Sequence, residues 1–365
     1  MATGAYISLD DGDLVLSTDS VTSAMWSDNN PTLLNYFTSS AQVASAVAPY
    51  YYTVYQTGST ETTAEIQFDI AYCDEVGSGS VELNPLVIGI SPTRINYGQY
   101  RNLVLGDENA SFIFGNQSSS YFYVLNLERA RYKQQILPGT WTLELSASTD
   151  VKLTDDSLIN PQTTFTEAGR VYNIISGSAG VPIAAATTAT TADGWTINSG
   201  SYGWVLPDVN LLILNGAALD GVANDGGIAL TTLRNDASSS NTDNNPLLMF
   251  NALNLGGGNW DQAGSGTGAA GDGTGFTLNS QENLSSDFIF CRARNSDFNY
   301  SSNPSFFSSS TGAIIFDSFI TNPTTYITTV GLYNQSQELL ATAKLSRPLE
   351  KDFTKELLVR VKLDF

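Results

Sequence analysis

The sequence repeats apolar residues at every second position far more often than at helical spacing. Residues 65–72 and 141–146 alternate in this way, and Pro138-Gly139 marks a turn before the second of these runs. Residues 121–127 form a continuous apolar and aromatic run, which is typical of a strand buried on both faces. A strongly apolar helical period is hard to find. The pattern therefore predicts an all-β fold with few short helices.

Two short segments are candidates for those helices. Residues 31–36 and 246–253 each begin with a proline that follows asparagines. Proline is well suited to the first turn of a helix, because its missing N–H has no partner there in any case. We therefore expect a short helix at each of these two places.

The chain of 365 residues is longer than one ordinary domain. We expect two or more domains of β-sandwich or jelly-roll type. Residues 1–148 are predicted to form an N-terminal β domain, 149–203 a connecting segment of strands and loops, and 204–365 a C-terminal β domain. Three tracts rich in Gly, Asn, Ser, Ala or Thr are predicted to be loops: 184–192, 235–245 and 256–275.

The C-terminal end shows the clearest strand pattern. Residues 326–333 predict a strand, 334–337 a turn and 339–345 the returning strand, which Arg347-Pro348 should end. Residues 357–365 predict a last strand. Its apolar face would carry Val359, Val361, Leu363 and Phe365, and its polar face Arg360 and Lys362.

Charge is scarce and uneven along the chain. Charged residues make up 14% of the sequence, and the net charge of -20 disfavours binding to nucleic acid. Residues 1–93 contain eleven acidic residues and no Lys or Arg, whereas residues 344–365 carry six basic ones. This asymmetry favours contacts between copies of the chain or with a differently charged partner; the alternative is ordinary solvated surface. Low charge and many aromatic residues also predict a homo-oligomer or a stable complex with another protein.

The sequence contains no histidine, which removes the most common general base and metal ligand. Carboxylate chemistry remains open, but we interpret Asp10, Asp11 and Asp13, and the pair Asp74 and Glu75, as solvated turn residues. The two cysteines, Cys73 and Cys291, lie in apolar runs and are expected to be buried free thiols. We expect no enzymatic activity, no catalytic or metal site and no cofactor.

Two further motifs have a simpler explanation than ligand binding. Residues 266–271 match the dinucleotide fingerprint G-x-G-x-x-G, but they lie in a tract where glycine is frequent throughout. Residues 10–13 and 235–245 offer oxygen ligands for a hard cation, yet neither follows the EF-hand pattern. We find neither a signal peptide nor an apolar run long enough to cross a membrane, so we expect the protein to stay in a cytoplasm until assembly.

One group of side chains is a candidate interface. The first basic residues of the chain are interleaved with tyrosines in two segments, and would form a basic patch on an acidic domain if the segments meet. The alternative is Arg–Glu pairing at a strand end. The candidate residues are Arg94, Tyr97, Tyr100, Arg101, Arg129, Arg131 and Lys133, to which Arg360 and Lys362 of the last strand are added.

Several segments resemble a known class of proteins. The residues RARNSDFNYSSNPS at 292–305, together with 324–333, 339–348 and 360–365, resemble the C-terminal region of structural proteins of large contractile-tailed bacteriophages. Residues 127–133 and 138–141 are similar to such proteins as well. The resemblance implies a virion protein of the tail, baseplate or neck region, whose partners are other virion proteins. It implies no catalytic residues.

Two other functions stay open. The first is a capsid-surface decoration protein or an appendage that binds a receptor or glycan. The second is a carboxylate-dependent enzyme that cleaves glycans, which a parallel β-helix would favour. The sequence shows no short regular repeat of the kind that a β-helix requires.

Overall fold

The chain forms two compact units in a computed structural model. Unit 1 comprises Met1–Ser20 and Asn283–Phe365, and unit 2 comprises Val21–Glu282. The structure describes residues 6–38, 51–58, 61–79, 91–115, 117–160, 164–183, 202–222, 226–232, 234, 244–257, 275–301 and 303–364. Strands account for 46% and helices for 14%, which confirms the predicted all-β class with few short helices.

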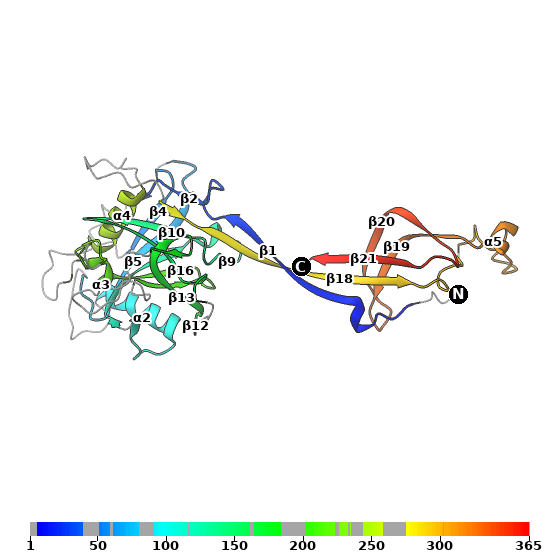
Figure 1. Cartoon of the computed structure of the whole chain (residues 1–365), viewed down its shortest axis with the longest axis horizontal. Coiled ribbons are helices and arrows are strands. Elements are labelled where there is room, and N and C mark those ends of the chain that lie inside the picture. The colour runs from blue at the N-terminus through cyan, green and yellow to red at the C-terminus, as the bar shows by residue number, and fades with distance from the viewer. Residues whose placement is uncertain are drawn as a thin grey trace. The chain divides into compact units, whose positions relative to one another are not determined.

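A large curled antiparallel sheet of thirteen strands dominates unit 2 (Figure 1). The strands of its main path follow one another in space as β2 (Thr32–Leu33), β17 (Phe276–Thr277), β10 (Thr142–Ser146), β11 (Asp150–Asp155), β13 (Gly169–Ser178), β15 (Gly203–Leu206), β16 (Leu211–Asn215), β8 (Tyr121–Leu127), β5 (Ile66–Asp74), β4 (Tyr51–Tyr55) and β3 (Phe37–Thr38). β12 (Thr164–Thr166) and β14 (Val181–Pro182) pair with β13. Two further strands, β6 (Phe112–Phe114) and β7 (Gln117–Ser119), form a separate hairpin.

Both faces of the sheet carry apolar cores, because successive side chains of a strand point to opposite faces. Along β8, Tyr123 and Leu125 belong to a first core, whereas Phe122 and Val124 belong to a second. β5 and β16 divide their apolar side chains between the two cores in the same way. This double burial explains the continuous apolar run at 121–127, and it confirms the strand predicted there.

Helices cover both cores of unit 2. The first core includes residues of α3 (Gly216–Asp220) and α4 (Asn244–Gly257), and the second includes residues of α2 (Pro92–Leu105). α4 confirms the helix predicted at 246–253. α2 was not predicted: it begins at Pro92 and ends at Gly106, whose φ of 67° is the left-handed conformation that glycine adopts readily.

The helix predicted at 31–36 is wrong. Residues Thr32–Leu33 form β2, and Leu33 pairs with Phe276 of β17. The Pro31 carbonyl accepts hydrogen bonds from the Leu278 N–H at 2.8 Å and from the Trp26 indole N–H at 3.1 Å. Pairing with β17 and Leu278, which are distant in sequence, thus replaces the hydrogen bonds that a helix would have made.

Unit 1 is built from the two ends of the chain. Its elements are η1 (Asp11–Asp13), β1 (Leu14–Ala24), β18 (Asn279–Ala293), α5 (Asp317–Thr321), β19 (Thr325–Tyr333), β20 (Leu339–Lys351) and β21 (Leu357–Asp364). β18 pairs with both β1 and β21, and β19 and β20 form a two-stranded sheet. β1 and β18 extend past the limits of unit 1, and β9 (Gln135–Ile136) pairs with the part of β18 that belongs to unit 2.

The predicted last strand is confirmed. β21 pairs with β18 over eight positions, from Leu357 opposite Ala293 to Asp364 opposite Ser286. Val361 is buried, Val359 and Leu363 are half-buried, and the alternate positions are exposed. The apolar and polar faces are therefore those that the sequence predicts, apart from Phe365, which lies outside the described residues.

The hairpin before it is also confirmed, except for its end. Arg347-Pro348 does not end the returning strand, because β20 continues to Lys351. The register jumps instead: Ile327 pairs with Leu349, and Thr329 pairs with Lys344. Pro348 has no backbone N–H to donate to the neighbouring strand. It lies in a bulge, where that position is not paired, as is usual for proline in a sheet.

The two units do not follow the predicted division of the chain. The predicted limits near residues 148 and 203 both fall inside unit 2, because strands from all three predicted segments pair with one another. β10 pairs with β11, and β13 pairs with β15. The predicted loop at 184–192, the motif at 266–271 and most of the other two loops lie outside the described residues.

Candidate functional site

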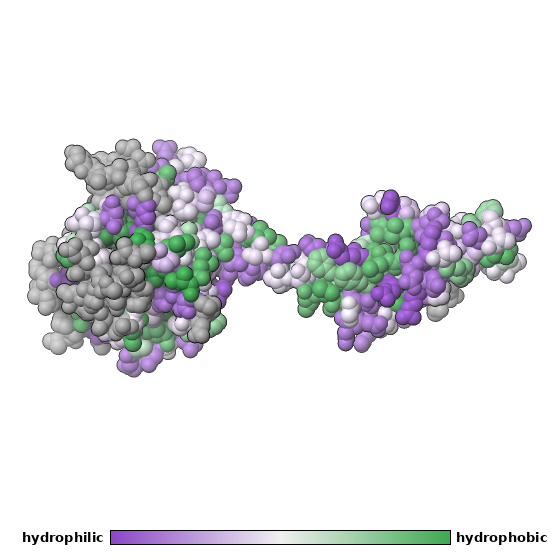
Figure 2. Space-filling view, in the orientation of Figure 1, coloured by the Kyte–Doolittle hydropathy of each residue, from purple (hydrophilic) through white to green (hydrophobic). Residues whose placement is uncertain are grey.

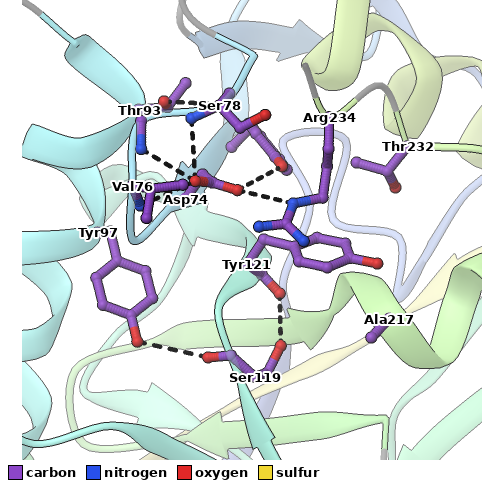
Figure 3. A network of polar contacts seen from close by, with 12 residues as sticks. Asp74, Val76, Ser78, Thr93, Tyr97, Ser119, Tyr121, Ala217, Thr232 and Arg234 are labelled. Atoms are coloured by element: carbon purple, nitrogen blue, oxygen red, sulfur yellow. Dashed lines mark hydrogen bonds and ion pairs between the residues drawn. The ribbon is translucent and has the colours of Figure 1, made fainter. Parts of the chain in front are cut away.

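The buried carboxylate of Asp74, at the end of β5, belongs to a network of polar contacts in unit 2 (Figure 3). Its Oδ1 accepts hydrogen bonds from the backbone N–H groups of Val76, Gly77 and Ser78, each at 3.0 Å. Its Oδ2 lies 2.9 Å from Nε of Arg234, which is 160 residues further along the chain. The carboxylate thus fixes a tight turn and ties that turn to a distant segment.

The same arginine leads to a second carboxylate. The Arg234 guanidinium lies over the ring of Tyr121, 4.2 Å from its centroid, and the Tyr121 hydroxyl donates to Asp220 at 3.0 Å. The other oxygen of Asp220 accepts from the N–H of Thr232 at 2.9 Å and from its hydroxyl. Desolvation by burial raises the pKa of Asp220, although hydrogen bonds from Thr232 and Tyr121 and the charge of Arg234 oppose this rise.

The network suits a structural role better than a catalytic one. Both oxygens of Asp74 and both of Asp220 are held by donors of the chain itself. A general acid or base needs a face open toward its substrate. Within the described residues, this arrangement cross-links the end of β5, the start of β8 and the segment around Arg234. Asp74 is thus a turn residue, as expected, but the expectation that its carboxylate is solvated is wrong, because the side chain is buried.

The first predicted interface group lies on α2. Tyr97 is buried in the second core, Tyr100 packs against that core, and Arg94 is half-buried. Arg101 lies over the Tyr97 ring at 5.5 Å. Burial raises the pKa of the Tyr97 hydroxyl to about 12, with the charge of Glu75 adding to this effect. The two tyrosines of this group thus contribute mainly to packing.

The second group lies on η2 (Arg129–Arg131), just after β8. Arg129 is exposed and lies over the Tyr132 ring at 4.9 Å, and Lys133 is exposed as well. Arg131 forms an ion pair with Glu65 at 2.6 Å. Arg101, Arg129 and Arg131 therefore each contact a partner within the chain, and an interface role for the two groups remains a prediction.

The last two predicted residues lie on the exposed face of β21. The Arg360 guanidinium lies 5.2 Å and the Lys362 ammonium 5.8 Å from the centroid of the Phe288 ring. Lys362 also forms an ion pair with Asp364 at 2.9 Å. The side chains of Arg360 and Lys362 are both exposed to solvent. They are placed where a partner surface can reach them.

The other sequence candidates have local roles. At residues 10–13, Asp13 accepts the Asp10 N–H at 3.0 Å and closes a turn. Among the described residues, no three His, Cys, Asp or Glu side chains come together as a metal site would need, and no helix is long and apolar enough to span a membrane. Cys73 is buried and Cys291 half-buried, and neither is in a disulfide.

The sequence analysis did not predict the exposed apolar surface of unit 1. Of the described residues in unit 1, four apolar side chains are buried, against forty-six in unit 2. The four are Ile289, Ala293, Phe306 and Val361. Unit 1 therefore buries far fewer apolar side chains for its size than unit 2 does, and burial of apolar side chains is the main favourable contribution to folding.

Seventeen large apolar side chains of unit 1 are instead well exposed. Leu16 of β1 is 73% exposed, Leu340 of β20 is 68% and Tyr326 of β19 is 63%. Figure 2 shows apolar patches in green on this face of unit 1, over the region of β19, β20 and β21. The sequence indicated this surface, because apolar residues in β19 and β20 occur at positions that face both sides of the hairpin.

Comparisons with protein-family models, with curated proteins and with solved structures found no match for the chain.

Proposed function

We propose that the chain is a non-enzymatic structural protein of a tailed-phage virion, which acts through protein–protein contacts in the tail, baseplate or neck region. The exposed apolar surface of unit 1 carries this proposal. A surface of that kind marks a contact site, and a unit with so few buried apolar side chains is suited to a place within an assembly. The phage context rests on the resemblance of the C-terminal segments described above.

The test is the composition of purified particles. The chain should be found by mass spectrometry in virions of the phage that encodes it, and antibodies against it should label one region of the tail or neck in electron micrographs. Absence from extensively purified particles would refute the virion role. Labelling over the whole head would support the alternative of a capsid-surface decoration protein.

One observation favours a second candidate, an appendage that binds a receptor or glycan. An aromatic cluster lies in unit 1, where the Phe306 and Phe319 rings stack at 4.8 Å and Tyr300 lies 5.3 Å from Phe306. Tyr300 and Phe316 are each 54% exposed, so their rings can stack on a sugar. Binding of host surface polysaccharide that Tyr300→Ala and Phe316→Ala both abolish, and Tyr326→Ala does not, would favour this candidate over a purely structural role.

The non-enzymatic part has a test of its own. The purified protein, incubated with capsule and lipopolysaccharide preparations, should release no new reducing ends. Hydrolysis that disappears on exchanging a carboxylate for its amide would show that the chain is a glycan-cleaving enzyme.

A further inference from the structure

β1 is exposed on both of its faces, which is unusual for a strand of eleven residues. Leu14 and Leu16 point to one face and Val15 to the other, and all three are exposed. A sheet that is stable in water normally buries at least one face. A neighbour on one side of β1 alone would still leave apolar side chains uncovered on the other.

The hairpin of β19 and β20 also lacks cover on its outer face. Ile327 and Leu345 are half-buried on one side, whereas Tyr326, Tyr333 and Leu340 are exposed on the other. An isolated two-stranded sheet is marginally stable at best. Both β1 and the hairpin therefore leave apolar side chains of unit 1 uncovered.

The charges of unit 1 are compatible with contact between two copies of this unit. Its sequence carries twelve acidic and eight basic residues, while unit 2 carries twenty-four acidic and eight basic ones. Exposed acids, Asp10 and Asp11, lie at the start of unit 1, and exposed cations, Arg360 and Lys362, lie on β21. A surface that presents both signs can be complementary to a second copy of itself, whereas two copies of unit 2 would repel each other.

We propose that unit 1 is a self-association surface, through which copies of this chain join into a closed ring in which each copy contacts two neighbours. The proposal deepens the structural function above and rests on it for its biological setting. Seventeen large apolar side chains, each exposing about half of the roughly 150 to 200 Å² that it can bury, give on the order of 1,500 Å² per chain. Standard contacts bury about 800 Å² per partner, so this area serves two neighbours.

The test is the mass of the full-length protein in solution, measured by sedimentation over a wide range of concentrations. The wild-type chain should sediment as a species of three or more copies. The double variant Leu16→Glu with Leu340→Glu should sediment as a single chain, because it places carboxylates in the apolar contact. Phe165→Glu in β12 of unit 2 is the matched control: Phe165 is 70% exposed, and this variant should keep the wild-type mass.

Three results would overturn the proposal. They are a monomeric wild-type chain at high concentration, a stable dimer that does not grow further, and an oligomer that the unit 1 variant keeps. The measurement needs no virion, so its outcome is independent of the proposed function. An oligomer in solution that is absent from particles would refute the virion role alone, and a monomer that is present in particles would refute self-association alone.

Discussion

At the scale of single residues, Asp74 offers the sharpest test of the fold of unit 2. Asp74→Ala leaves three backbone N–H groups without their acceptor and Arg234 without its counter-charge. Leaving buried donors without an acceptor costs about 1 to 3 kcal/mol, and the ion pair adds less because the Arg234 side chain is 36% exposed, so the free energy of unfolding should fall by about 1 to 3 kcal/mol. Denaturant unfolding measures it.

Asp74→Asn is the matched control for that variant. The amide keeps an oxygen that can accept from the turn but loses the charge that faces Arg234. We expect it to lose less stability than Asp74→Ala. Equal losses would show that the hydrogen bonds of the turn contribute nothing measurable.

Asp220 gives a prediction for pH. Burial raises its pKa above the ordinary 3.8, so the folded state binds this proton more tightly than the unfolded state does. The contribution of Asp220 to stability is therefore highest below the ordinary pKa and is lost as pH rises through the raised one. Asp220→Asn removes this dependence, and its free energy of unfolding relative to wild type should rise with pH across that window. Urea unfolding at several pH values checks this; a relative stability that falls with pH would contradict it.

The sequence revealed only part of this site. Asp74 was identifiable as a turn residue because glycine and serine follow it closely, and the structure gives it that role. Its partner Arg234 was not identifiable, because no local pattern links residues 160 positions apart. Contacts of this kind depend on which strands pair, and a single sequence does not encode that pairing in any periodic form.

At the scale of elements, β21 is the most informative strand. Deleting residues 359–365 removes the buried Val361 and most of the ladder with β18. Because unit 1 has few buried apolar side chains, we predict that the truncated protein loses the folding of unit 1 and is not incorporated into particles. Thermal unfolding and particle incorporation measure the two effects. A truncated protein that keeps both would show that β21 is dispensable.

Arg360→Gln with Lys362→Gln is the paired variant for the same strand. Both side chains lie on the exposed face of β21, so the fold should remain intact. Assembly should weaken if these cations meet an acidic surface. Unchanged incorporation into particles would show that Arg360 and Lys362 do not contribute to the interface.

Strands were easier to predict than helices in this chain. Alternating apolar residues predicted β5, β10 and β21, and a continuous apolar run predicted β8, because burial on one face or on both faces of a strand is visible in a single sequence. α2 was missed because its buried residues, Thr93, Tyr97 and Val104, include a polar one and are widely spaced. Its end signals, Pro92 and Gly106, were present and would have located it.

At the scale of the whole molecule, the sequence predicted the all-β class but not the two units. The units do not follow the order of the chain, because the first twenty residues join the last eighty-three to form unit 1. The amino-acid composition along the chain does not indicate that residues near its start and its end belong to the same unit. Of the eleven acidic residues in 1–93, four lie in unit 1 together with the six basic residues of 344–365, and the other seven lie in unit 2.

Hydrogen exchange most directly tests whether unit 1 obtains its missing burial from neighbouring copies. The wild-type chain is compared with Leu16→Glu/Leu340→Glu. We predict that amides of β19, β20 and β21 are protected in the wild type and exchange at least about tenfold faster in the variant, while amides of β5, β8 and β16 are unchanged. Equal protection of β19, β20 and β21 in both proteins would show that unit 1 is complete within a single chain, and would contradict its role as an assembly surface.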